Sequence, residues 1–158
     1  ATVGGSIYSR FGFSDVLTMF LALNASVELY KGGVVPLAEY AQRPYDRDIL
    51  MRVLVPKENA RFVYQSVRNS QTDFPVLTCA AAKLADGSIR AAIGARPGKA
   101  VLYTAAPEAG ETAEEFAARF AAEVKAGIKT ESNLRGGAEY RRHLAGVLTK
   151  RAVCRLEG

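Results

Sequence analysis

The feature that most constrains the fold is an apolar run over residues 76–84, bounded by Pro75 and by the dipeptide Asp86-Gly87. An apolar run of this length between turn residues predicts a buried strand. Asp-Gly between two such runs favours a tight hairpin turn, which joins this strand to a second one over residues 89–95. The chain is therefore expected to contain an antiparallel sheet.

Short strand patterns flank this hairpin, with residues 101–103 as the candidate for a third strand, and two helices are predicted after it. Short strand patterns occur at Phe62-Tyr64 and at residues 101–103. The sequence from Thr112 to Glu115 is a capping box, and the apolar residues that follow it recur every four residues up to Gly127, which is expected to end the helix as a C′ residue. A last helix is predicted from about residue 137 to 151. We predict a three-stranded antiparallel sheet backed by two helices for residues 58–158.

The first part of the chain predicts a smaller unit. Ser14 and Asp15 are good N-cap residues for an apolar helix over residues 16–24. Strands are expected over residues 27–30 and 48–55, with a short helical piece between them that begins at Pro36. The pattern restarts after Lys57, so we divide the chain into residues 1–57 and 58–158, and the overall class is α+β.

Composition excludes several classes of protein. The chain has 158 residues, of which 49% are hydrophobic and 23% are charged, which is typical of a globular protein of one ordinary domain or two small ones. Its longest apolar stretch, residues 16–23, is far shorter than the roughly 20 residues that span a bilayer. No secretory signal is recognisable. We therefore expect a cytoplasmic protein without membrane insertion.

Residues suited to metal binding or acid–base catalysis are few and scattered. Cys79 and Cys154 are isolated and are interpreted as reduced thiols, with a disulfide or a metal left as the less favoured alternatives. His143 is the single histidine, and we expect it on the surface. The carboxylates at residues 111–115 are interpreted as charges that favour a helix N-terminus. No catalytic residue and no metal site is predicted.

The formal charge of +5 arises largely at the end of the chain. Six cations lie in the last two dozen residues, namely Arg135, Arg141, Arg142, Lys150, Arg151 and Arg155. Nucleic-acid modules usually add aromatic side chains for stacking, and Tyr140 alone is aromatic there. A solvated helix face, or a surface for an acidic protein partner, is favoured over nucleic-acid binding.

The first fifteen residues contain the strongest candidate binding site. The adjacent glycines Gly4 and Gly5 allow a turn through positive φ and a close approach to a ligand. Thr2 and Ser6 offer hydroxyl groups beside them, and Asp15 can accept a hydrogen bond from a sugar hydroxyl. No Met and no strand precede these residues, so we expect the chain to be part of a larger unit.

Four phrases, taken together, resemble the FAD-binding subunits of molybdenum hydroxylases, a family that includes carbon monoxide dehydrogenases and xanthine dehydrogenases. They run through the chain in the family's order, at residues 2–15 (Thr-Val-Gly-Gly to Ser-Asp), 48–56, 68–76 and 132–144 (Ser-Asn-Leu-Arg-Gly-Gly-Ala-Glu-Tyr-Arg-Arg-His-Leu). The resemblance implies a partial second FAD-binding subdomain, made of a helix and antiparallel strands, followed by the family's C-terminal α+β domain. It also implies FAD contacts at Thr2, Val3, Gly4, Gly5, Ser6, Asp15 and Leu50.

The resemblance implies an electron-transfer role beside a molybdopterin-binding large subunit and an iron–sulfur small subunit. Some positions depart from the family. Ser6 replaces the usual asparagine, Gln65 stands where some members carry a cofactor-contacting lysine, and residues 8–13 are bulkier than usual. The family's glycine-rich pyrophosphate loop is absent from the sequence. We interpret Arg68 and Asp73 as a structural pair between the two parts of the chain. A cofactor-free docking module of the same type of complex is the alternative.

Overall fold

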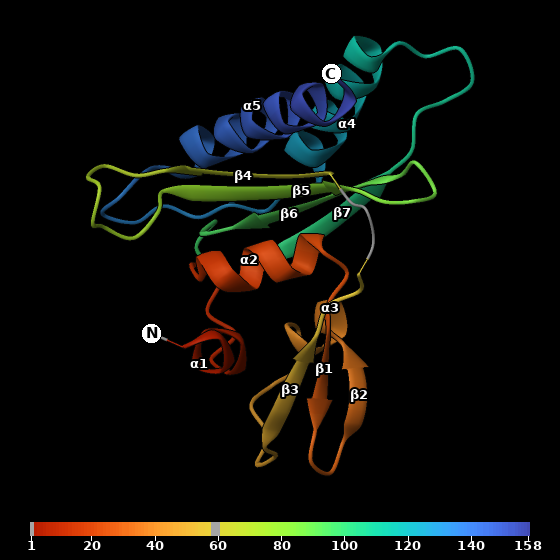
Figure 1. Cartoon of the computed structure of the whole chain (residues 1–158). Helices are drawn as coiled ribbons and strands as arrows, with labels where there is room; N and C mark the ends of the chain where they lie inside the picture. The colour runs from red at the N-terminus through yellow and green to blue at the C-terminus, as the bar shows by residue number, and fades with distance from the viewer. Residues whose placement is uncertain (1, 58–60) are drawn as a thin grey trace.

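The computed structural model describes residues 2–57 and 61–158, which form two antiparallel sheets and five helices (Figure 1). Helices α4 and α5 cover one face of a four-stranded sheet, α2 covers the opposite face, and a three-stranded sheet lies beyond α2 (Figure 1). The elements are α1 (Val3–Tyr8), α2 (Asp15–Ala22), β1 (Ser26–Leu29), β2 (Gly33–Pro36), α3 (Leu37–Tyr40), β3 (Leu50–Leu54), β4 (Arg61–Val67), β5 (Leu77–Lys83), β6 (Ile89–Gly94), β7 (Val101–Ala105), α4 (Ala113–Gly127) and α5 (Ala138–Glu157). The predicted α+β class is confirmed.

The larger sheet has the order β4-β5-β6-β7, with antiparallel pairing throughout. The predicted hairpin is confirmed, because Cys79 pairs with Ile93 across it and Gly87 takes the positive φ of +83° that its turn requires. The prediction of three strands was wrong. Both short patterns that flank the hairpin form full strands, because β4 pairs with β5 and β7 pairs with β6 along their whole lengths.

The central strands have an apolar residue at almost every position because both faces of the sheet are covered. Leu77, Cys79 and Ala81 of β5 pack against α4 and α5, where the large side chains of Phe116 and Phe120 complete the core. The alternate residues of β5 and β6, namely Ala80, Ala82 and Ala92, pack on the α2 side. The two faces of one sheet therefore share the same strands but bury side chains of different size.

The two C-terminal helices largely follow the prediction. The capping box of α4 is present, with Thr112 Oγ1 accepting from Glu115 N–H and the Glu115 carboxylate accepting from Thr112 N–H. Gly127 is the last helical residue rather than a C′ residue, and Ile128 is the C-cap. Helix α5 continues to Glu157, beyond the predicted end at residue 151, because the side chains of its last turns, Val153 among them, are buried in the core.

The first part of the chain forms the smaller sheet, with the order β2-β1-β3. Strand β2 was not predicted and begins at Gly33, whose φ is +65°. Ser14 is the N-cap of helix α2, as predicted, but the helix covers Asp15–Ala22 rather than residues 16–24. It packs on β5 and β6, so the first part of the chain shares a core with the larger sheet.

Residues 58–60, beside the predicted boundary, lie outside the described residues. Among the described helices, none is long and apolar enough to cross a membrane.

Candidate functional site

The glycine pair lies in a helix and not in the turn that its sequence favoured. Gly4 and Gly5 belong to the six-residue helix α1, and neither has a positive φ. Thr2 is the N-cap, and its Oγ1 accepts a hydrogen bond of 3.1 Å from Gly5 N–H. A Cβ at Gly4 would meet no atom within 4 Å, so Gly4 leaves open space beside the helix instead of providing a strained turn.

Two hollows lie next to α1, and together they collect most of the predicted site residues. The first, here called the polar hollow, has a volume of about 790 Å³ and is bordered by Thr2, Gly5, Ser6 and Asp15. The second, the α1–β3 hollow, has a volume of about 410 Å³ and is bordered by Gly4, Gly5 and Leu50. Gly5 borders both hollows. Val3 is exposed and lines neither of them.

Asp15 is held by Tyr64 of β4 and by Arg68, the residue that follows β4, neither of which the sequence analysis placed in the site. Tyr64 Oη donates to Asp15 Oδ1 at 2.5 Å, and Arg68 Nη2 donates to Asp15 Oδ2 at 2.6 Å. Burial and the neighbouring negative charge of Asp15 raise the pKa of Tyr64. The Asp15 side chain is still 38% exposed. Since each carboxylate oxygen can accept more than one hydrogen bond, Asp15 retains capacity for a ligand hydroxyl.

The expected structural pair of Arg68 and Asp73 is replaced by two pairs. Arg68 forms its ion pair with Asp15, and it contacts Asp73 only through the backbone carbonyl, at 2.6 Å. The Asp73 carboxylate is instead held by Arg135, with N–O distances of 2.7–3.1 Å. Hydrogen bonds from Arg135 lower the pKa of Asp73, although partial desolvation opposes this shift. Arg68 therefore links α2 to β4, and Asp73 links the β4–β5 connection to the segment before α5.

The family-like phrase at residues 132–144, which runs into α5, serves the fold. Arg141 is completely buried, and its guanidinium donates to the carbonyl oxygens of Val76, Glu131 and Gly136 and to Asn133 Oδ1. This network fixes the bend from Ser132 to Gly137 against the start of β5. Two of the six cations in the basic end, Arg135 and Arg141, are therefore engaged inside the fold.

The side chain of Gln65 lies on the side of the sheet away from both hollows. Its Nε2 donates to the Leu148 carbonyl of α5 at 3.1 Å, on the face of the sheet opposite α2. A lysine at this position would therefore not contact a cofactor in either hollow. The adjacent Tyr64 points to the α2 side. The departure noted at Gln65 therefore has no consequence for these hollows.

His143 is exposed, as predicted, and Cys79 is buried in the core, where burial raises the pKa of its thiol to about 12.

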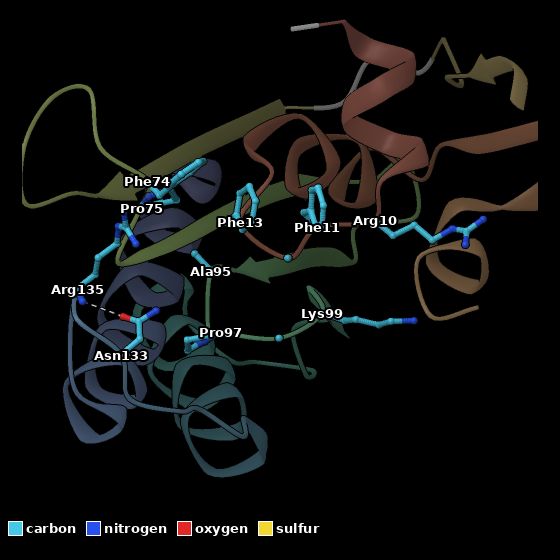
Figure 2. Close-up of a pocket in the computed structure, with 12 residues that line it drawn as sticks. Arg10, Phe11, Phe13, Phe74, Pro75, Ala95, Pro97, Lys99, Asn133 and Arg135 are labelled. Carbon is cyan, nitrogen blue, oxygen red and sulfur yellow. Dashed lines mark hydrogen bonds between the residues drawn. The ribbon is translucent and has the colours of Figure 1, made fainter. Parts of the chain in front are cut away.

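A third hollow, of about 470 Å³, was missed by the sequence analysis (Figure 2). We call it the aromatic hollow because the side chains of Phe11, Phe13 and Phe74 form one of its walls. Phe13 stacks on Phe11, with 5.1 Å between the ring centroids, and its ring is tilted by 56° against that of Phe74, at a centroid distance of 4.6 Å. The bulk of residues 8–13 was the available signal, but its contact with Phe74 depends on the tertiary fold.

Comparisons with known proteins agree with this architecture. The family model for the CO dehydrogenase flavoprotein C-terminal domain matches residues 62–156, and the model for the FAD binding domain in molybdopterin dehydrogenase matches residues 1–58. The uncharacterized protein YgfM of Escherichia coli K12 is 26% identical over 151 residues, which are 94% of this chain. The chain spans 55% of the length of that relative.

Three solved structures share the fold over 99% of this chain. They are carbon monoxide dehydrogenase from Hydrogenophaga pseudoflava lacking the Mo-pyranopterin moiety (TM-score 0.82, 22% identity, 60% of that chain), reconstituted CO dehydrogenase from Oligotropha carboxidovorans (0.80, 21%, 61%) and quinoline 2-oxidoreductase from Pseudomonas putida 86 (0.78, 20%, 60%). These identities show the fold alone. The family model over residues 62–156 covers more than half of the chain, and this protein therefore belongs to the family of the CO dehydrogenase flavoprotein C-terminal domain.

Proposed function

We propose that this chain is part of the FAD-binding, electron-transferring subunit of a molybdopterin-dependent oxidoreductase. The observation that carries the proposal is the meeting of six predicted contact residues around α1. Thr2, Gly5, Ser6 and Asp15 border the polar hollow, and Gly4 and Leu50 border the α1–β3 hollow beside it. Four of the six come from the first six residues of the chain, whereas Asp15 and Leu50 reach the hollows from α2 and β3.

The chemistry of these side chains suits one wall of a dinucleotide site. Thr2 and Ser6 provide hydroxyl groups, the half-exposed Asp15 can accept from a ribityl or ribose hydroxyl, and Arg68 adds a cation next to Asp15. The family's glycine-rich pyrophosphate loop has no counterpart in the sequence. The residues present therefore fit part of FAD, and residues 1–158 alone are expected to fold but to bind FAD weakly or not at all.

Bound FAD supplies the redox chemistry, and this chain's residues supply position and electrostatics. Within the proposal, electrons pass between iron–sulfur clusters of a small subunit and an acceptor, beside a molybdopterin-binding large subunit. We place the limit between the two domains at residues 57 and 58, so that the FAD-domain part is 1–57 and the C-terminal α+β domain is 58–158. The course of the chain from β3, which ends at Leu54, to β4, which begins at Arg61, supports this limit.

The test uses the intact gene product that carries residues 1–158. After purification, its visible flavin absorbance gives the occupancy, and reconstitution with FAD followed by fluorescence gives the Kd. Asp15→Ala removes a charged acceptor, so we expect the Kd for FAD to rise about tenfold or more. Glu114→Gln, an exposed acid of α4 away from the hollows, serves as the control and should leave the Kd unchanged.

Unchanged occupancy in Asp15→Ala would show that Asp15 serves the fold alone, through Tyr64 and Arg68. Fully occupied FAD in residues 1–158 alone would contradict the expectation that one wall is insufficient. A colourless gene product that cannot be reconstituted would instead support a cofactor-free docking module. The exposed cations Lys150, Arg151 and Arg155 along α5 favour that second candidate.

A further inference from the structure

Arg10 is buried in the connection between α1 and α2, although its side chain is charged. That side chain is 2% exposed, and its backbone has a φ of +51°, which residues other than glycine seldom adopt. Its guanidinium lies over the rings of three tyrosines, with centroid distances of 4.0 Å to Tyr40, 5.2 Å to Tyr45 and 5.8 Å to Tyr8. Residues in such backbone conformations persist where the surrounding structure holds them, and they cluster at ligand sites. Arg10 also belongs to residues 8–13, the stretch that departs from the family resemblance.

The same guanidinium reaches the part of the chain that precedes β3. Arg10 Nη1 donates to the Pro44 carbonyl at 2.8 Å, and Arg10 Nη2 lies 3.6 Å from Asp46 Oδ1 in an ion pair. Beside it, Tyr45 Oη donates to the Ser9 carbonyl, so hydrogen bonds connect the two segments in both directions. Figure 2 shows that the Arg10 side chain points away from the phenylalanine rings of the aromatic hollow. We call these contacts, together with the three tyrosine rings around the guanidinium, the Arg10 clasp.

The Arg10 clasp connects the two walls of the α1–β3 hollow. One wall comes from α1 and the other from the start of β3, and they are formed by Gly4, Gly5 and Tyr8 and by residues 48–50. Arg10 lies just after the first wall in sequence, and its ion-pair partner Asp46 lies just before the second. The second wall is also fixed on its far side, because the Asp48 carboxylate accepts hydrogen bonds of 2.8–3.2 Å from the backbone N–H groups of Lys31 and Gly32. The position of α1 relative to this wall therefore depends on the clasp.

We propose that Arg10 is a positioning residue, which sets the separation of the two walls of the α1–β3 hollow and thereby its affinity for part of FAD. Arg10 can have this role only if that hollow receives FAD, as proposed above. It borders neither this hollow nor the polar hollow, so it acts through α1 and through residues 44–46. Walls that are held in place before binding raise the affinity, because less conformational freedom is lost. A lysine could keep a cation over Tyr40, but it lacks the planar fork that reaches Pro44 and Asp46 together.

The test uses the intact gene product with the substitution Arg10→Gly. Glycine adopts the φ of +51° without strain, so this change removes the clasp and keeps the path of the backbone. We expect the Kd for FAD to rise about three- to tenfold. The amide hydrogens of Gly5, Ser6 and Ser9, which are bonded within the α1 segment, should exchange about tenfold faster in the absence of FAD. Asn24→Gly is the matched control, because it makes the same kind of change at a φ of +55° away from the hollows, and it should alter both quantities less than about twofold.

A second variant and a stability measurement separate positioning from a contribution to folding alone. Arg10→Lys keeps a cation over the Tyr40 ring and should recover part of the affinity that Arg10→Gly loses. A Kd for Arg10→Lys no lower than that for Arg10→Gly would contradict the role of the clasp.

Urea denaturation shows whether each variant is folded. If Arg10→Gly lowered the free energy of unfolding but left the Kd and the exchange rates unchanged, Arg10 would serve the fold alone and the proposal would be overturned. If the unaltered gene product bound no FAD, the proposed function would fail. The exchange rates are measured without ligand, so they would still decide whether Arg10 fixes the α1 wall.

Discussion

The two faces of the four-stranded sheet bury side chains of different size, although the same strands form both. On the α4 and α5 side, large side chains such as Phe116 and Phe120 pack against Ile89 and Ile93. On the α2 side, the sheet presents mainly alanines, with Thr78 and Gly94 beside them. All three hollows adjoin the α1–α2 segment on this second side.

The difference shows how one sheet can serve stability on one face and a binding site on the other. Large side chains on the helix side bury much apolar surface, which is the main favourable contribution to folding. Small side chains on the α2 side let the backbone of the first segment lie close to the sheet. Thr18 Oγ1 thus reaches Thr78 Oγ1 at 3.3 Å, and the Gly12 carbonyl reaches the end of β6. We expect substitutions on the two faces to separate stability from binding.

The largest effect is expected from Phe120→Ala on the helix side. Phe120 is 1% exposed and stacks parallel to Phe116, with 6.0 Å between the ring centroids. Its truncation leaves a cavity in the main core and should lower the free energy of unfolding by about 3–5 kcal/mol, measured by urea denaturation. The Kd of the folded, intact gene product for FAD should remain unchanged. A coupled loss of binding in the folded protein would break the proposed separation of the faces.

A smaller effect is expected from Gly94→Ala on the α2 side. A Cβ there would lie 2.4 Å from Thr18 Oγ1, 2.5 Å from Thr78 Oγ1 and 2.8 Å from the Gly12 carbonyl oxygen. Because two backbone segments would have to move apart, we expect a loss of about 1–3 kcal/mol in urea denaturation and a higher Kd of the intact gene product for FAD. The matched control is Gly146→Ala in α5, where the nearest contact would be an ordinary 3.4 Å.

Gly146→Ala should stabilise the protein by about 0.5–1 kcal/mol, because alanine favours a helix interior over glycine. The two substitutions add the same methyl group on opposite sides of the sheet. If both stabilised the protein, the close approach of the first segment at Gly94 would not be a feature of the protein in solution.

The smallest effect concerns acid stability on the helix side. Hydrogen bonds from Arg119 are the largest cause that lowers the pKa of Glu111, from 4.5 to about 2. A carboxylate whose pKa is lower in the folded state stabilises the fold above the unfolded pKa, and this contribution is lost as the pH falls through the folded value. Glu111→Gln should therefore flatten the fall in unfolding free energy between pH 4.5 and about 2. Asp73→Asn, on the site side, is the comparison. The pKa of Asp73 is lowered from 3.8, so Asp73→Asn should change the pH dependence of the unfolding free energy only below about pH 3.8. Parallel curves for Glu111→Gln and the unaltered protein would contradict this assignment.

Local patterns predicted those parts of the fold that depend on neighbouring residues in the sequence. The Asp86-Gly87 turn and the Thr112 capping box formed as predicted, because each is stabilised within a few residues. The glycine pair at Gly4 and Gly5 was assigned wrongly, because glycine permits positive φ but does not require it. Thr2 Oγ1 caps the first turn there, and α1 forms instead.

The candidate site could be predicted only in part for the same reason. Thr2 and Asp15 were identified by their spacing within one resembling phrase, and both border the polar hollow. Tyr64 and Arg68, which hold Asp15, are 49 and 53 residues away in sequence. Arg68 was expected to pair with Asp73, its neighbour in sequence. In the fold, Arg68 pairs with Asp15 instead, and Asp73 pairs with Arg135.

The sequence by itself therefore determined the family, the α+β class, the central hairpin and six of the residues that border the hollows beside α1. Those features depend on local propensities and on motifs that are continuous in the chain. Only the tertiary structure decided that four strands pair in the larger sheet, that Asp15 is tied to β4 through Tyr64, and that Phe13 meets Phe74. These contacts bring together residues far apart in the chain, and they depend on the small side chains that allow α2 and the Gly12 loop to approach the sheet.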